Sequence, residues 1–158
     1  MSAVVLKPGE GHTLTLGSIH VVVQEDGTQT RGTFGLAEFE VPPHAPTPPP
    51  HIHHAHEEGF YILEGEISFQ IGENQIVATA GMFANMPVGT PHSFANKSHK
   101  PAKMLISVAP AGLEQMFFDI GVPVDQQATT APPPSKAEIE KLLKVAPRYG
   151  IEIMLPKH

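Results

Sequence analysis

Three histidines and a glutamate are spaced along this chain so that they could bind one divalent metal. His51 and His53 lie two positions apart in the stretch HIHHAHEE, which ends at Glu58, and His92 lies in a second stretch. Side chains alternate along an extended strand, so histidines at i and i+2 project to the same face. Imidazole and carboxylate together are donors that many divalent transition metals accept. The sequence therefore predicts a metal site formed by His51, His53, Glu58 and His92.

The residues around these positions favour strands over helices. Six prolines between residues 42 and 50 make a helix leading into His51 unfavourable. Residues 60–63 are aromatic and branched, which is typical of a buried strand. A break before Glu58 would let its carboxylate return to the same centre as His51, whereas His92 must come from a distant strand.

The spacing of these residues resembles the two motifs of the cupin family. His51-x-His53 followed by Glu58 and Gly65 matches the first motif, and the second motif is matched by Gly81, Pro87, Gly89, His92 and Asn96. The resemblance implies that Glu58, and not Glu57, is the carboxylate ligand, because Glu58 has the expected distance to Gly65. The glycine that precedes the first histidine in the family motif is replaced here by the proline-rich stretch. The chain is most similar to small single-domain cupins described as quercetin-dioxygenase-like.

The fold implied by this resemblance is all-β, namely the cupin double-stranded β-helix or jelly-roll barrel, followed by two short C-terminal helices. Residues 1–158 would form a single cupin domain, with the barrel core at about 12–110 and a helical extension at about 111–158. Short strand patterns separated by turn signals also predict a sandwich or barrel. These patterns cover residues 12–16, 18–24, 33–41, 66–71, 75–79, 93–95 and 103–108.

Two helices are predicted directly from the residue pattern of the last third of the chain. Between Gly112 and Gly121, apolar side chains recur at i, i+3, i+4 and i+7, namely Leu113, Met116, Phe117 and Ile120. This stripe could line the mouth of a pocket or pack against the barrel. After a polar, proline-rich connection at 122–134, Ser135 and Glu138 form a capping-box pattern. The apolar face that follows comprises Ile139, Leu142, Leu143 and Ala146, and Pro147 is expected to end the helix.

Two further histidines compete with the four predicted ligands. His54 is offset by one position from His53 and should face away from it. His56 shares the parity of Glu58 but lies in the expected break. We therefore expect both side chains to be exposed to solvent or to bond to the ligands from outside.

Composition narrows the range of partners and compartments. The formal net charge of −6 argues against nucleic acid or an anionic membrane as a partner. No apolar run is long enough to span a bilayer, and the first residues do not have the pattern of a signal peptide. The chain has no cysteine, which excludes disulfides and thiolate ligands. We expect a cytoplasmic protein, and a homodimer because a small sheet with an exposed edge invites pairing.

The function implied by the resemblance is a metal-dependent dioxygenase that acts on a flavonol-like or other enolic small molecule. The cofactor would be a divalent transition metal (Fe, Mn, Ni, Co, Cu or Zn), and Glu58 would act both as a ligand and as the catalytic proton acceptor. Two alternatives stay open at this point: a non-oxidative metal-dependent isomerase or lyase, and a non-catalytic small-molecule-binding cupin. A Lys, Arg or Tyr pointing at the metal would favour the first, and a closed pocket the second.

One feature of the sequence bears on the substrate independently of the family. Residues 32–96 contain neither lysine nor arginine, so this stretch offers no fixed cation to a phosphate or dicarboxylate. This weakens the sugar-phosphate isomerase and oxalate-degrading interpretations, although Arg31 or Lys97 could reach in. An apolar lining would suit an aromatic or enolic compound. The candidates for that lining, which could equally be plain core, are Phe60, Ile62, Phe83, Phe94 and Met104.

Overall fold

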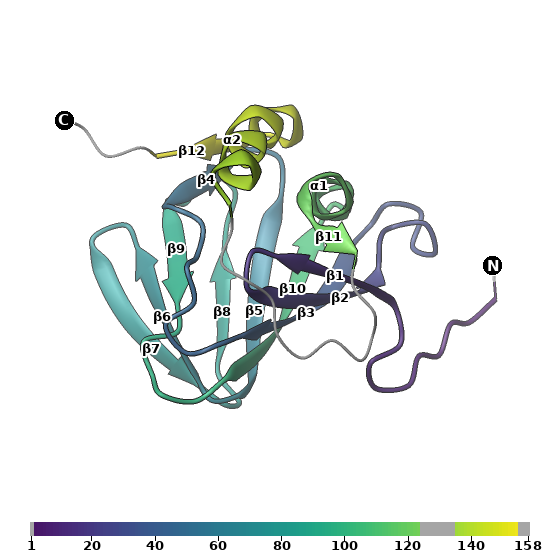
Figure 1. Cartoon of the computed structure of the whole chain (residues 1–158). Helices are drawn as coiled ribbons and strands as arrows, with labels where there is room; N and C mark the ends of the chain where they lie inside the picture. Colours follow the sequence, from purple (N-terminus) through teal and green to yellow (C-terminus); the bar gives the residue numbers. More distant parts are fainter. Residues whose placement is uncertain (1, 124–134, 155–158) are drawn as a thin grey trace.

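Two antiparallel β-sheets form the framework of the computed structural model, which describes residues 2–123 and 135–154 (Figure 1). The larger sheet has seven strands in the order β11-β1-β2-β3-β10-β5-β8, and the smaller has five in the order β12-β4-β9-β6-β7. The predicted all-β jelly-roll architecture with two short C-terminal helices is confirmed. No helix within the described ranges is long and apolar enough to cross a membrane.

The first three strands lie in the larger sheet, and from β4 onward the chain crosses repeatedly between the two sheets. The larger sheet contains β1 (His12–Leu16), β2 (Ile19–Glu25), β3 (Gly35–Val41), β5 (Glu57–Glu64), β8 (Phe83–Met86), β10 (Ala102–Ala109) and β11 (Val122–Pro123). The smaller sheet contains β4 (His51–His53), β6 (Glu66–Ile71), β7 (Asn74–Thr79), β9 (His92–Ala95) and β12 (Ile151–Ile153). The helices are α1 (Leu113–Ile120), α2 (Lys136–Val145) and the short 3₁₀ helix η1 (Ala146–Tyr149).

The predicted strands all exist. Their ends differ from the prediction by at most two residues, except that β5 begins at Glu57, three residues before the predicted stretch at 60–63. The predicted hairpin at residues 66–79 is formed by β6 and β7, which pair from Glu66↔Thr79 to Ile71↔Asn74. The sequence does not predict β8, β11 and β12 as strands. They are two to four residues long, which is too short for an alternating pattern to emerge.

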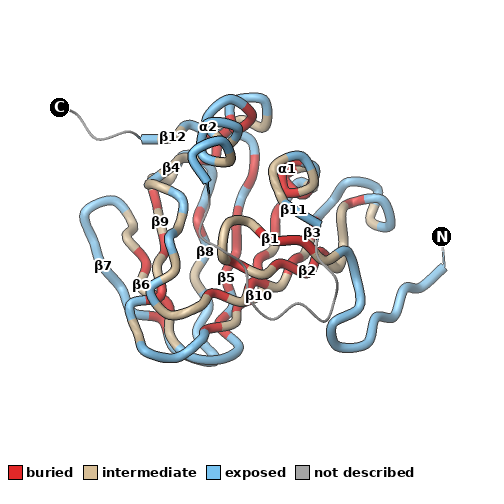
Figure 2. Tube along the Cα trace, viewed as in Figure 1, coloured by how far each residue is buried: buried red, intermediate tan, exposed pale blue. Residues whose placement is uncertain are grey.

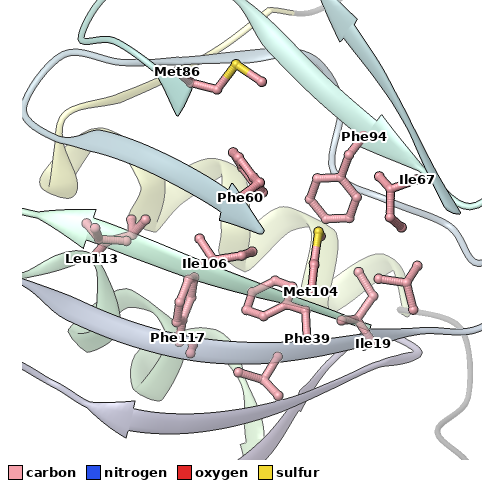
Figure 3. Close-up of a cluster of buried hydrophobic side chains, with 14 of the residues drawn as sticks. Ile19, Phe39, Phe60, Ile67, Met86, Phe94, Met104, Ile106, Leu113 and Phe117 are labelled. Atoms are coloured by element: carbon pink, nitrogen blue, oxygen red, sulfur yellow. The ribbon is translucent and has the colours of Figure 1, made fainter. Parts of the chain in front are cut away.

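The hydrophobic core lies between the inner faces of the two sheets, where aromatic side chains from both sheets meet (Figure 3). Phe60 on β5 contacts Phe69 on β6 edge to face, with ring centroids 5.1 Å apart. Phe39 on β3 meets Phe94 on β9 in the same way at 6.5 Å. Figure 2 shows the buried positions along these strands and the exposed positions at the outer turns. This packing fixes the distance between the strands that carry the histidines and the glutamate.

Both predicted helices are present and lie together at one end of the sandwich (Figure 1). Leu113, Met116 and Phe117 of α1 are buried, as the apolar stripe predicts. The capping box of Ser135 and Glu138 at the start of α2 is also confirmed.

The predicted apolar face of α2 is only partly buried. Ala146 is buried, whereas Ile139 is 48% and Leu143 38% exposed. α2 ends at Val145, before Pro147 as expected, and Pro147 lies in η1, where its missing N–H is tolerated in a first helical turn. Of the predicted connection at 122–134, Val122 and Pro123 form β11, and the remainder lies outside the described residues.

The C-terminal strand β12 supports the short strand that carries two of the histidines. Ile151 pairs with His53 and Ile153 pairs with His51. On its other side, β4 pairs with β9 through His51 and His92. The three-residue strand β4 is therefore held between two neighbours, and β12 is the one that pairs with its whole length.

Gly150, which joins η1 to β12, should be sensitive to substitution. Its φ is +73°, and an added Cβ would lie 2.9 Å from the Cβ of Ala55. Gly72 is a matched control because its φ is +57° but an added Cβ would meet no atom within 4 Å. We expect Gly72→Ala to lower the free energy of unfolding by about 1–2 kcal/mol through the backbone alone. Gly150→Ala should lower it further. Urea unfolding followed by circular dichroism tests this, and equal losses in both variants would contradict a role for the Ala55 contact.

Candidate metal centre

The structure brings the four predicted ligands together from three strands. His51 and His53 come from β4, Glu58 from the start of β5 and His92 from β9. One donor atom of each residue lies within 4.8 Å of the donor atoms of the other three. His53, Glu58 and His92 are buried, and His51 is half-buried.

Glu58 lies at the centre of this cluster. Its Oε1 atom is 3.1 Å from Nε2 of His53 and 3.1 Å from Nε2 of His92. Ligands at adjacent positions of an octahedral ion, with bonds of about 2.1 Å, lie about 3 Å apart. The spacing of these donors therefore matches the spacing that a bound metal requires.

Hydrogen bonds on the far side of two imidazole rings orient the rings toward the centre. Nδ1 of His51 lies 2.9 Å from the carbonyl oxygen of Pro49, and Nδ1 of His92 lies 2.9 Å from that of Thr90. Each Nδ1 then donates its proton to a carbonyl, so Nε2 is the ring nitrogen that would bind a metal, and at His92 the metal would replace the hydrogen bond between Nε2 and Glu58. Both ring nitrogens of buried His53 lack a hydrogen-bond partner, because its contact with Glu58 is poorly aligned. A buried polar atom without a partner is costly, and a metal at the centre would supply that partner for Nε2.

The charges in the cluster suit a cation. Burial alone would raise the pKa of Glu58, yet the imidazoles of His53 and His92 hold it well below its usual range. Burial lowers the pKa of His51 to about 4, so this ring is neutral at pH 7. Burial also disfavours the charged form of His92, but hydrogen bonds to Glu58 and to the Thr90 carbonyl raise its pKa above the usual value. The cluster thus combines a fixed carboxylate with imidazoles, and this donor set could hold a divalent transition metal.

The alternative donors nearby are directed elsewhere. Glu57 is exposed and accepts a hydrogen bond of 2.6 Å from Asn85. His54 faces away from the cluster, as its parity predicts, and lies 2.9 Å from the exposed Glu152 carboxylate. His56 is buried, so the expectation of an exposed side chain is wrong. Its Nδ1 bonds to the carbonyl of Pro110 at 2.8 Å, and it does not contact the cluster.

A cavity of about 260 Å³ adjoins the cluster, with His51, His53 and Glu58 in its wall. The remaining wall is mostly apolar and comes from both sheets, the proline-rich loop, the two helices and β12. The apolar residues of this wall include Leu16, Ile19, Phe39, Phe94, Ile106, Leu113, Met116, Phe117, Ile120, Ile139, Leu142, Ile151 and Ile153. The α1 stripe therefore fills both roles considered for it, because it packs on the core and lines the cavity.

The residues predicted as an apolar lining mostly have another role. Of those five, Phe94 is the one in the cavity wall. Phe60, Ile62 and Met104 are at most 1% exposed and belong to the core. Phe83 is 63% exposed, because it lies on the outer face of β8 opposite Tyr61. Period-2 alternation marks apolar positions on a strand, but it does not tell which of the two faces is directed inward when the strand is short.

Residues 37–108, which include all four donors, match the cupin domain family. The fold is similar to that of a predicted oxalate decarboxylase from Thermotoga maritima. The TM-score is 0.62 at 19% sequence identity, over 68% of this chain and 99% of that chain. Residues 37–108 are a cupin domain. The cupin fold inferred from the two motifs is thereby confirmed.

This cupin is also similar in sequence to the quercetin 2,3-dioxygenase of Bacillus subtilis (strain 168). The two are 26% identical over 120 residues, which is 76% of this chain and 35% of that enzyme. The cupin thus spans about a third of the length of this curated relative. KdgF from Halomonas sp. has a similar fold, with a TM-score of 0.54 at 13% identity over 70% of this chain and 89% of that chain.

Sequence reasoning missed most of the cavity wall. The proline-rich loop contributes Pro46, Pro48 and Pro49, and β12 contributes Ile151 and Ile153. The loop departs from the family motif, and its prolines are a signal for a rigid wall, because proline fixes φ. No local signal in IEI marks Ile151 and Ile153 as neighbours of His53 and His51.

Proposed function

We propose that this cupin is a metal-dependent dioxygenase of enolic small molecules, with His51, His53, Glu58 and His92 as the metal ligands. The observation that supports the proposal best is a buried cluster of three histidines and one glutamate that faces an apolar cavity. The similarity to a quercetin 2,3-dioxygenase adds support for the class of reaction. A divalent transition metal bound there supplies a Lewis acid with coordination positions left for small ligands.

Each residue of the site then has a defined task. His51 and His92 offer Nε2 because their Nδ1 atoms are engaged with backbone carbonyls. Glu58 accepts the proton of the enol, because it is the one carboxylate among the four donors and it lies in the cavity wall. The apolar wall excludes water and holds the uncharged body of the substrate.

The two alternative functions lack a specific observation in their favour. An isomerase or lyase would be favoured by a Lys, Arg or Tyr directed at the donors, and among the described residues none of these types lines the cavity. A purely binding role would be favoured by a closed pocket, whereas this cavity reaches three of the four donor residues. The homodimer and the cytoplasmic location stay predictions.

Oxygen consumption tests the proposed function. The protein would be stripped of metal and reloaded in turn with Fe(II), Mn(II), Co(II), Ni(II) and Cu(II). We expect metal-dependent oxygen uptake with a hydroxypyranone or flavonol substrate, accompanied by loss of the substrate's absorbance. Metal-free protein and free metal serve as controls. Stoichiometric loading without uptake for any metal would contradict the dioxygenase and favour a non-oxidative or binding role.

A further inference from the structure

The two C-terminal helices form one wall of the cavity. Met116 and Phe117 of α1 and Ile139 and Leu142 of α2 are among the lining residues. All four lie beyond residue 108, where the match to the cupin domain family ends. The wall that faces the donor cluster is therefore supplied by a part of the chain that the family match does not include.

This wall is fixed in place by contacts at its ends. The hydroxyl of Tyr149 donates a hydrogen bond to the Asp119 carboxylate, which ties the end of α1 to η1. Directly after η1, β12 pairs with β4 along its full length. The segment that follows α2 is thus joined both to α1 and to the strand that carries His51 and His53. The volume of about 260 Å³ is below the range of about 300–1,000 Å³ that is usual for drug-sized ligands.

The polar side chains of the wall disfavour an anion. They are Thr47, His51, His53, Glu58 and Glu138, and in residues 2–123 and 135–154 no lysine or arginine joins them. Hydrogen bonding to the backbone N–H and the side chain of Ser135 lowers the pKa of Glu138, so this carboxylate is charged at pH 7. Apart from the metal itself, a carboxylate or phosphate on the substrate would meet the negative charge of Glu138 and no lysine or arginine to pair with.

We propose that α1 and α2 limit the substrate of this site to a compact, uncharged, single-ring enol, with Ile139 and Leu142 as the residues that set the size limit. The inference rests on the proposed function for the identity of the reacting group. It goes further because it assigns selectivity to the C-terminal helices and separates single-ring from multi-ring substrates. Both residues line the cavity, and Ile139 is 48% exposed whereas Leu142 is half-buried.

Three probes with the same hydroxypyranone group test size and charge separately. Maltol is a single neutral ring, 3-hydroxyflavone carries that ring within a three-ring system, and comenate is a single ring with an added carboxylate. Each would be titrated anaerobically into the Co(II)-loaded protein, with binding followed by the visible absorption of the cobalt. We expect maltol to bind at least about tenfold more tightly than either of the other two, since a poor fit of small groups costs about that much.

Variants of α2 identify the residues that set the limit. Leu142→Ala should bring the affinity for 3-hydroxyflavone to within about threefold of that for maltol, and Ile139→Ala should act in the same direction. Leu143→Ala is the matched control, because Leu143 lies on the same helix but outside this cavity, and its ligand preference should equal that of the parent protein. Because Ile139 is exposed, Ile139→Ala should fold, and it still tests the size limit if Leu142→Ala does not fold.

The possible outcomes separate this inference from the proposed function. Equal or tighter binding of 3-hydroxyflavone by the parent protein would overturn the size limit, and equal binding of comenate would overturn the charge limit. The same titrations are repeated with metal-free protein, and binding is detected by the line broadening of the ligand NMR signals. They measure the preference for a small, uncharged ring in the absence of a metal. Selective binding of maltol without oxygen uptake would support the inference while contradicting the dioxygenase. Binding of none of the probes in either form would overturn the inference itself.

Discussion

His92→Ala will release the metal, with an affinity loss of at least about 100-fold. Loss of an outer residue that only orients a ligand already costs about 10–100-fold in metal affinity, so loss of a direct ligand should exceed that range. His92 is 2% exposed, and its Nε2 lies 3.1 Å from the Glu58 carboxylate. Metal content after dialysis and competition with a chromophoric chelator measure the effect.

The control for this prediction is His54→Ala. His54 lies on the same segment as the donors, but it is exposed and contacts Glu152 instead of the cluster. This variant should bind metal like the parent protein. His51→Ala provides a second test that leaves the contact between Glu58 and His92 in place. Stoichiometric metal retained by both His51→Ala and His92→Ala would overturn the ligand assignment.

Glu58→Gln will lower the rate of oxygen uptake by about 10²–10⁴-fold when the variant is assayed at equal metal loading. This is the usual loss when a general base is removed. Glutamine keeps the shape of the side chain, but its amide cannot take the proton of the enol. The variant should also bind metal more weakly, because a neutral amide replaces a carboxylate that is charged in the parent protein. Initial rates of oxygen uptake, corrected for metal content, measure the effect.

Glu57→Gln is the matched control for this second prediction. Glu57 is the neighbouring carboxylate, but it is exposed and bonds to Asn85. Its loss should leave metal content and oxygen uptake unchanged. A rate for Glu58→Gln within about twofold of the parent at equal loading would show that Glu58 is not the proton acceptor. In that case the metal content of the variant alone would decide whether Glu58 is a ligand.

Local patterns accounted for the cluster and the helices. The i, i+2 spacing of His51 and His53 predicts that both side chains lie on one face of their strand. This holds wherever the strand lies in the fold, because side chains alternate between the two faces of any strand. The stripe from Leu113 to Ile120 and the capping box at Ser135 are equally local, since each describes neighbours on one helix. These features needed no knowledge of distant contacts, and the structure bears out both helices.

The cavity could not be predicted in the same way. Phe83 and Phe94 are both aromatic residues on short strands, yet one lies on an outer face and the other lines the cavity. The difference is set by the register and by the neighbouring strand, which are long-range properties. The burial of His56 has a similar cause, because its partner is the carbonyl of Pro110, 54 residues away.

By itself, then, the sequence determined the fold family and the set of four side chains that meet, because two stretches with fixed internal spacings resemble the two cupin motifs. Only the tertiary structure decided what surrounds them. The helices α1 and α2 face the cluster because the chain returns through η1 and pairs β12 with β4. That return brings residues about 100 positions apart into contact, and no local periodicity records which distant segments will pack together.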